Sequence, residues 1–361
     1  KEPAAIWKAT LPLGNGHIGM MPAGKIREET IVLNDITLWS GGIQDADDPE
    51  AAKYLPEIRE LLFEGNNDLA QDLVYKTFVC KGQGSGKGSG AKVPYGSFEM
   101  LGKLHLRFDL DSSANPENYL RQLSLDEAVA QTAFTLNGVY FTRECFVSFT
   151  DKVGIIRLKT SGKGALNLAI GIDRPEKSET TVEGNLLKMS GQLENGADGK
   201  GMRFQALVSA KTKGGKVITE GNRLRIQNAD EVLIFVSAGT DYKNPEFPQP
   251  VYRNLENASV KKYNEMKKSH IAEYRKYFNR VELNLPVNPE RELLTTPERL
   301  TAFAENPDDN GLVNLYFQYG RYLLISSACA QILPPNLQGL WANTVQRSEE
   351  RRVGKECRSR W

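Results

Sequence analysis

The sequence predicts a multidomain protein in which an N-terminal antiparallel β-sandwich is followed by helices. Over residues 1–250, short segments rich in β-branched and aromatic residues alternate with Gly- and Asn-rich turn signals. After a proline-rich stretch at residues 244–250, apolar residues instead recur at three- and four-residue steps. Short strands that succeed one another without intervening helices favour two antiparallel sheets packed face to face.

The strands are predicted where β-branched and aromatic residues are concentrated. The clearest segment, residues 139–147, reads VYFTRECFV. Further strands are predicted at residues 153–159, 165–172, 202–210 and 231–238, separated by turns at residues 137–138, 161–164, 194–199, 213–215 and 220–222. One helical insertion is expected near residues 49–77, where helical spacing is kept by Leu55, Ile58, Leu61, Leu62, Leu69 and Leu73.

The second part of the chain is predicted to be helical. Residues 256–278 have the spacing of one long amphipathic helix, and residues 280–285 resemble a short strand. Thr296 is expected to cap a helix that has a proline in its first turn. Residues 312–328 are apolar on nearly every side, so this helix requires partners all round, and we expect structure beyond this chain to supply them. The predicted domains are the sandwich at residues 1–250, a helical linker at 251–285 and the first, truncated helices of another domain at 286–346.

Composition and charge exclude two classes of partner. Hydrophobic residues make up 40% and charged residues 25% of the 361 residues, as in a soluble globular protein. No apolar run approaches the roughly 18 residues that a membrane span requires. The last 15 residues hold six Lys or Arg and three Glu, so the other 346 carry 40 basic and 42 acidic residues. No basic face is expected, and therefore no nucleic-acid partner.

No metal site or cofactor is predicted. Cys80, Cys145 and Cys329 are far apart and lack the spacing of metal ligands, so we interpret them as buried thiols. The histidines outside the front of the chain, His105 and His270, are equally isolated.

Two further patterns have structural interpretations. The segment GQGSGKGS at residues 82–89 lacks the Ser or Thr that must follow the lysine of a phosphate-binding loop. Glu305, Asp308 and Asp309 precede the apolar helix, where carboxylates stabilise a helix N-terminus.

A series of motifs runs in order along the chain. They read LPLGNGHIGM at residues 11–20, IVLNDITLWSGG at 31–42, PYG at 94–96, LGKLHL at 101–106, LSLDEA at 123–128, HIAEYRKYFNR at 270–280, LYFQYGRYLLI at 315–325 and LPPNLQGLW at 333–341. In order and spacing they resemble glycoside hydrolase family 95, the α-L-fucosidase family, and its bacterial members in particular. The resemblance implies a β-sandwich, a helical linker, an (α/α)6 catalytic barrel and a C-terminal β-domain.

The same resemblance implies an activity, the hydrolysis of terminal α-L-fucosyl bonds with inversion. An inverting glycosidase needs an acid and a water-activating group about 6.5–9.5 Å apart. In this family these are a Glu and an Asn working with an Asp, and the Asn belongs to a His-x-Asn-x-Asn segment shortly after the motif at 333–341. No such segment occurs in this sequence. We therefore expect the catalytic residues to lie outside this chain, and the chain by itself to be inactive.

Candidate substrate-binding residues lie in or directly after three motifs. Asn336, Gln338, Trp341 and Asn343 lie where the chain leads toward the catalytic segment. His17 and Trp39 lie in the front motifs and are expected where the sandwich meets the barrel. For each of them, packing is the alternative role.

Residues 347–361, RSEERRVGKECRSRW, resemble the translation of a common sequencing adapter. We therefore expect an artefact joined to the N-terminal portion of an enzyme. The alternatives are a non-catalytic carbohydrate-binding sandwich, an α-L-galactosidase of the same family, and a related (α/α)6 enzyme of family 65. The resemblance also implies a fucosylated oligosaccharide or polysaccharide as substrate and a periplasmic or secreted location.

Overall fold

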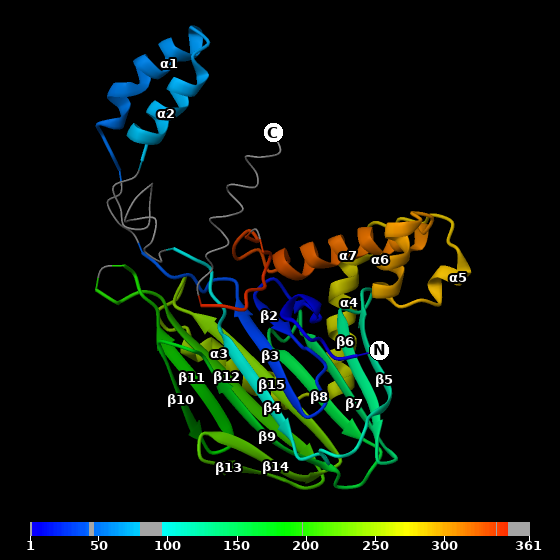
Figure 1. The fold of residues 1–361 in the computed structure, drawn as a ribbon. Coiled ribbons are helices and arrows are strands. Elements are labelled where there is room, and N and C mark those ends of the chain that lie inside the picture. Colours follow the sequence, from blue (N-terminus) through cyan, green and yellow to red (C-terminus); the bar gives the residue numbers. More distant parts are fainter. Residues whose placement is uncertain (1, 43–46, 80–95, 197, 337, 346–361) are drawn as a thin grey trace. The chain divides into compact units, whose positions relative to one another are not determined.

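The computed structural model describes residues 2–42, 47–79, 96–196, 198–336 and 338–345 (Figure 1). Three predictions lie outside the described residues: the buried thiol of Cys80, the loop at 82–89 and the tail at 347–361. By its contacts the chain divides into two compact units. The first contains residues up to 38, 98–191 and 203–345, and the second contains the described residues of 39–97 and 192–202. The predicted linker and the helices after it thus belong to the same compact unit as most of the sandwich.

Two antiparallel sheets form the N-terminal part, which confirms the predicted fold class. The first sheet has the order β1 (Leu13–Gly14), β2 (Ile18–Met21), β3 (Glu28–Asp35), β4 (Gly102–Phe108), β9 (Leu166–Asp173), β14 (Arg223–Ala229) and β13 (Lys216–Glu220). The second has the order β10 (Ser178–Glu183), β11 (Leu186–Gln192), β12 (Arg203–Lys213), β15 (Glu231–Thr240), β8 (Gly154–Thr160), β7 (Val139–Val147), β6 (Val129–Leu136) and β5 (Glu117–Ser124).

The second sheet is covered on both faces. One face packs on the first sheet, and the other packs on helices α3 (Pro248–Ser259) and α4 (Tyr263–Phe278) (Figure 1). Phe146 and Phe235 from the strands share a buried cluster with Val251 and Leu255 of α3 and Met266 of α4. Consequently the central strand β15 is buried over most of its length instead of alternating between core and solvent.

The predicted helix at 256–278 is wrong in its extent. The structure has two helices there, and the chain turns at residues 260–262, where Val260 is 80% exposed. Helix α3 begins at Pro248, because proline lacks the N–H that the first helical turn leaves unpaired. Val260 keeps the helical spacing of the apolar residues on both sides, but it does not share a buried face with them.

The predicted strand at 280–285 is also absent, because no neighbouring strand lies beside it among the described residues. The side chain of Asn314 instead accepts from the Leu285 N–H and donates to the Leu285 carbonyl, both at 3.1 Å. The helix expected from Thr296 is α6 (Thr296–Glu305), and its N-cap is Thr295 rather than Thr296. The Thr295 N–H donates to the Glu298 carboxylate at 2.7 Å, as in a capping box. A short helix, α5 (Pro289–Glu292), precedes it.

The apolar helix is α7 (Asn310–Ala328), and Asp309 caps it by accepting from the Leu312 N–H at 2.9 Å. The predicted capping role of Asp309 is thereby confirmed. One side of α7 is buried through Leu312 and Tyr322, but Tyr316 is 79% and Leu324 is 61% exposed. The sequence predicts that helix α7 is buried on all sides, but the described residues bury only one side of it.

The second compact unit holds the helices of the predicted insertion. They are η2 (Ala51–Tyr54), α1 (Leu55–Phe63) and α2 (Asn67–Thr77), and α1 packs on α2. Ile58 and Ala70 are buried in this pair. Elsewhere the chain begins with a short 3-10 helix, η1 (Trp7–Ala9). In the described part of the chain, no helix has the length and apolar character needed to cross a membrane.

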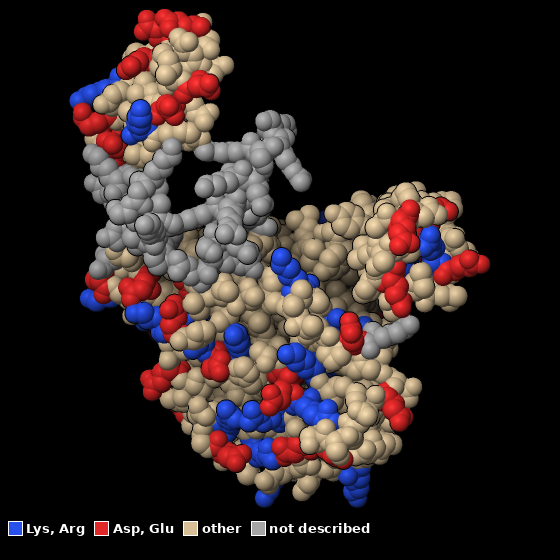
Figure 2. Space-filling model, in the orientation of Figure 1, with Lys and Arg blue, Asp and Glu red and all other residues tan. Residues whose placement is uncertain are grey.

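Charges are interspersed on the face of the molecule shown in Figure 2. Over the first sheet, Arg107 pairs with Glu28 at 3.0 Å, and Arg225 pairs with Asp109. No single sign of charge dominates this face.

Candidate functional site

The front motif forms a tight hairpin, β1 to β2, against the end of α7. Asn15 holds the turn, because its Oδ1 accepts from the N–H groups of His17 (3.0 Å) and Ile18 (2.9 Å). Gly16 has a φ of +79°, and its N–H donates to the Ser326 carbonyl at 2.7 Å. A Cβ at Gly16 would lie 2.4 Å from the backbone nitrogen of Ala330. The motif therefore needs glycine here both for its backbone conformation and for the close approach of α7.

His17 forms an ion pair with a fully buried carboxylate. Its Nε2 lies 3.0 Å from Oδ2 of Asp35, and Oδ1 of Asp35 accepts from the Thr37 N–H (2.9 Å) and hydroxyl (2.6 Å). Burial disfavours the charged imidazole, but the charge and hydrogen bond of Asp35 outweigh it, so the pKa of His17 is raised. Burial likewise opposes ionisation of Asp35, but His17 and Thr37 lower its pKa below the ordinary value.

The segment that contains most predicted site residues is held on the sandwich. The indole Nε1 of Trp341 donates to the Leu13 carbonyl at 2.9 Å, and Asn34 Nδ2 donates to the Ala342 carbonyl at 2.9 Å. The Met100 N–H donates to the Thr344 carbonyl at 3.0 Å. Trp341 and Ala342 are buried, so this segment is part of the core where the sandwich meets α7.

The predicted site residues fall into three groups. His17 and Trp341 lie on or against the front hairpin. Asn336 forms a turn, since its Oδ1 accepts from the Gln338 N–H at 2.8 Å, and it is half-buried, as are Gln338 and Asn343. Trp39 belongs to the second compact unit. Whether these side chains bind sugar remains a prediction, and the buried indole of Trp341 has a packing role as well.

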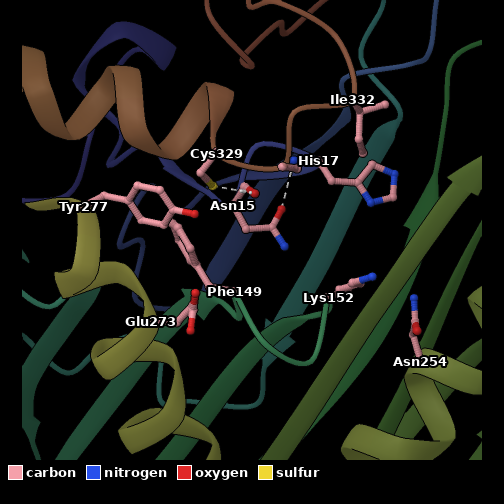
Figure 3. Close-up of a pocket in the computed structure, with 10 residues that line it drawn as sticks. Asn15, His17, Phe149, Lys152, Asn254, Glu273, Tyr277, Cys329 and Ile332 are labelled. Carbon is pink, nitrogen blue, oxygen red and sulfur yellow. Dashed lines mark hydrogen bonds between the residues drawn. The ribbon is translucent and has the colours of Figure 1, made fainter.

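A cavity of about 370 Å³ lies beside His17 (Figure 3). Its lining residues come from five separated segments of the first compact unit: Asn15, His17, Phe149, Lys152, Asn254, Glu273, Tyr277, Cys329, Ala330 and Ile332. The Cys329 thiol donates to the Asn15 carbonyl at 2.9 Å, and burial raises its pKa to about 12. This thiol is therefore neutral and unreactive at physiological pH.

Sequence reasoning misses most of this cavity. Lys152 lies in the turn between β7 and β8, and Glu273 and Tyr277 lie on α4. Glu273 and Tyr277 lie within the motif at 270–280, and the helical spacing places Tyr277 on the apolar face of a helix, but neither is marked as a site residue. No motif contains Lys152. Asp35 lies within the motif at 31–42, but only the pairing of Ile18 with Asp35 across β2 and β3 brings it to His17.

The remaining histidines and cysteines have separate environments. His105 lies 3.1 Å from Asp173, between β4 and β9. His270 is buried with its Nε2 2.9 Å from the Glu127 carbonyl, and burial lowers its pKa to about 4. Cys145 is buried as predicted, whereas Cys329 is half-buried. Among the described residues, no three His, Cys, Asp or Glu side chains are grouped as metal ligands would be.

Two family models match the chain. Residues 1–245 match the model described as glycosyl hydrolase family 65, N-terminal domain, and residues 262–350 match the glycosyl hydrolase family 95 catalytic domain. The boundary between them falls within the α3–α4 region that follows the last strand, β15.

The chain is also similar to curated proteins. Alpha-L-fucosidase 2 of Arabidopsis thaliana is 30% identical over 95% of this chain, and a probable alpha-fucosidase A of Aspergillus niger is 30% identical over 92%. The chain spans 43% of the length of each of these relatives. Because the relatives come from a plant and a fungus, they do not support the expected bacterial source.

Among solved structures, a candidate kojibiose phosphorylase from the human microbiome is similar with a TM-score of 0.45 and 11% identity. The match covers 74% of this chain and 35% of that one. Because this TM-score is low, the fold assignment rests on the two antiparallel sheets and not on this match.

Proposed function

We propose a function for a chain that belongs to the glycosyl hydrolases, with a family 65 N-terminal domain at residues 1–245 and a family 95 catalytic region from residue 262. It is part of an exo-glycosidase that hydrolyses terminal α-L-fucosyl residues of glycans with inversion. The observation that carries this proposal is the similarity to proteins named alpha-fucosidase, which extends over 92–95% of the chain and therefore includes both regions.

The contacts of the segment at 336–345 support a positioning role for this chain in the proposed reaction. The segment at 336–345 leads toward the expected catalytic residues. The sandwich fixes its backbone through Asn34 and Met100, and the Leu13 carbonyl accepts from its Trp341 indole. Inversion requires the acid and the water-activating group to stay about 6.5–9.5 Å apart across the sugar, so the backbone that carries such groups must be rigid. The buried hydrogen bonds of this segment supply that rigidity.

The chain itself is proposed to be inactive, because its sequence lacks a His-x-Asn-x-Asn segment after Trp341. Asn336, Gln338, Asn343 and His17 are proposed to line or support the sugar pocket. The substrate is proposed to be a fucosylated oligosaccharide or polysaccharide in the periplasm or outside the cell.

The test is to express the complete reading frame and to follow the hydrolysis of an α-L-fucoside by ¹H NMR. The proposal requires that fucose is released and that its β-anomer appears first. A parallel assay with an α-L-galactoside tests the α-L-galactosidase alternative, since L-fucose and L-galactose differ by one hydroxyl at C6. Release of the α-anomer first would contradict inversion, and no release of either sugar would contradict the glycosidase function.

A further inference from the structure

The cavity beside His17 has the size and position of a small-molecule site. Its volume of about 370 Å³ lies at the low end of the roughly 300–1,000 Å³ that such sites occupy. It is formed where the β1–β2 turn, the β7–β8 turn, α3, α4 and the chain after α7 converge. Figure 3 shows the Lys152, Asn254 and His17 side chains around one end, and Tyr277 and Phe149 at the other.

Several polar groups of the lining have no protein partner. In the described part of the chain, the Lys152 ammonium, the Asn254 amide and the Tyr277 hydroxyl make no hydrogen bond or ion pair. The Asn15 side chain, in contrast, already has partners. Its Nδ2 donates to the Ser148 carbonyl at 3.0 Å, and its Oδ1 accepts from two N–H groups of the hairpin. The cavity therefore presents both donors and acceptors, as a ligand with several hydroxyl groups requires.

The charges around the cavity favour a neutral ligand over an anion. The charge of Lys152 opposes the protonation of His17, whereas the paired Asp35 carboxylate favours it. Asp35 balances His17, and Glu273 contributes a carboxylate at the other end of the cavity, where it pairs with Lys276 at 2.6 Å. An anion attracted by Lys152 would thus meet a carboxylate in the same space.

The aromatic end is held in place by its own contacts. Phe149 packs edge-on against His270 and Tyr274, with ring centroids 5.5 Å apart in each case. The Tyr277 ring lies beneath the Arg280 guanidinium at 5.3 Å. Fixed aromatic rings beside free hydrogen-bonding groups provide an apolar surface for the C–H face of a sugar and partners for its hydroxyls.

The backbone at Lys152 is strained. Its φ of +59° is in the left-handed region, which is unfavourable for a residue with a side chain relative to glycine. The turn is fixed by the Ser148 N–H, which donates to the Val153 carbonyl at 2.8 Å. A glycine would satisfy this turn without strain, but the chain has a lysine here, and this residue lines the cavity.

We propose that this cavity binds one neutral sugar residue of the glycan. The sugar ring lies on Tyr277 and Phe149, and its hydroxyls bond to Lys152, Asn254 and the Tyr277 hydroxyl. This inference rests on the proposed function only for the choice of a sugar as ligand. It assigns binding roles to Lys152, Asn254 and Tyr277, none of which is among the substrate-binding residues predicted from the sequence.

The test is to titrate the 361-residue chain with methyl α-L-fucopyranoside and, separately, with methyl β-D-galactopyranoside, and to measure saturation-transfer NMR and chemical shifts. At least one glycoside should bind saturably. Asn254→Ala and Tyr277→Phe should each weaken it up to about tenfold, the loss expected for one hydrogen bond. Asn257→Ala, an exposed position on the same helix α3, is the matched control and should leave binding unchanged.

Two results would overturn the proposal: no binding of either glycoside, or equal binding by wild type and both cavity variants. Circular dichroism establishes that each variant is folded, and Tyr277→Phe is chosen because it keeps the ring. Binding is measured apart from hydrolysis. Sugar binding here without fucosidase activity of the complete reading frame would contradict only the proposed function, whereas hydrolysis without binding at this cavity would contradict only this inference.

Discussion

The indole Nε1 of Trp341 donates to the carbonyl oxygen of Leu13 at 2.9 Å, across 328 residues of sequence. This bond joins the front motif, which belongs to the family 65 N-terminal domain, to the family 95 region. The neighbouring bond from Asn34 to the Ala342 carbonyl joins the same two parts. The sandwich therefore stabilises the segment at 336–345 directly.

Replacing Trp341 should show how much this contact contributes. Trp341→Phe keeps much of the packing but leaves the buried Leu13 carbonyl without its donor, so the free energy of unfolding should fall by about 1–3 kcal/mol. Trp341→Ala should cost about 3–5 kcal/mol, because it also creates a cavity. Urea denaturation followed by fluorescence and circular dichroism measures both. Equal stability of wild type and Trp341→Ala would show that the segment is not held on the sandwich.

A pair of glycines separates backbone strain from crowding. Gly138 has a φ of +75° and open space within 4 Å of the position that a Cβ would take, whereas a Cβ at Gly16 would meet the backbone of residue 330. Gly138→Ala should lower the free energy of unfolding by only about 1 kcal/mol. Gly16→Ala should lower it by about 2–4 kcal/mol, since the end of α7 must also move. Similar losses in the two variants would contradict the close approach of α7 to the hairpin.

The ion pair of His17 with Asp35 should make stability depend on pH. Since the folded pKa of His17 is raised, its contribution is fully present below the ordinary value of 6.5 and is lost as the pH rises through the folded pKa. Since the folded pKa of Asp35 is lowered, its contribution is present above 3.8 and is lost as the pH falls through the folded pKa. The pair should therefore contribute most between pH 3.8 and 6.5.

Denaturation of wild type and His17→Asn between about pH 6 and pH 9 measures this contribution. The difference in the free energy of unfolding between them should shrink as the pH rises. His105→Asn is the control, because its pair with Asp173 is more exposed and should contribute little. A difference between wild type and His17→Asn that is constant over this range would contradict the raised pKa.

The exposed side of α7 should cause self-association of this chain. Tyr316 and Leu324 are exposed on a helix whose only charged residue is Arg321, and apolar patches of this kind promote aggregation. The double variant Tyr316→Lys with Leu324→Lys should remain monomeric at concentrations where wild type scatters light. Ala304→Lys, which adds charge at an exposed position on α6, should not have this effect. A monomeric wild type would contradict the prediction.

The sequence predicts an element well where its turn signals and its residue pattern indicate the same bounds. The strand predicted at 139–147 has the bounds of β7, because the Asn137–Gly138 turn signal precedes it and its residues favour a strand. The break at 260–262 escapes sequence reasoning, since the exposed Val260 continues the apolar spacing of both helices. The cavity could not be predicted, because its residues come from five segments that only the tertiary structure brings together.

The most direct test of the proposed function compares the complete reading frame with this chain in a single assay of fucose release from an α-L-fucosyl oligosaccharide. We predict that the product of the complete reading frame releases fucose and that this chain, folded but lacking the catalytic segment, releases none. Release of fucose by this chain would place the catalytic groups within residues 1–361. No release by either protein would contradict the assignment to fucoside hydrolysis.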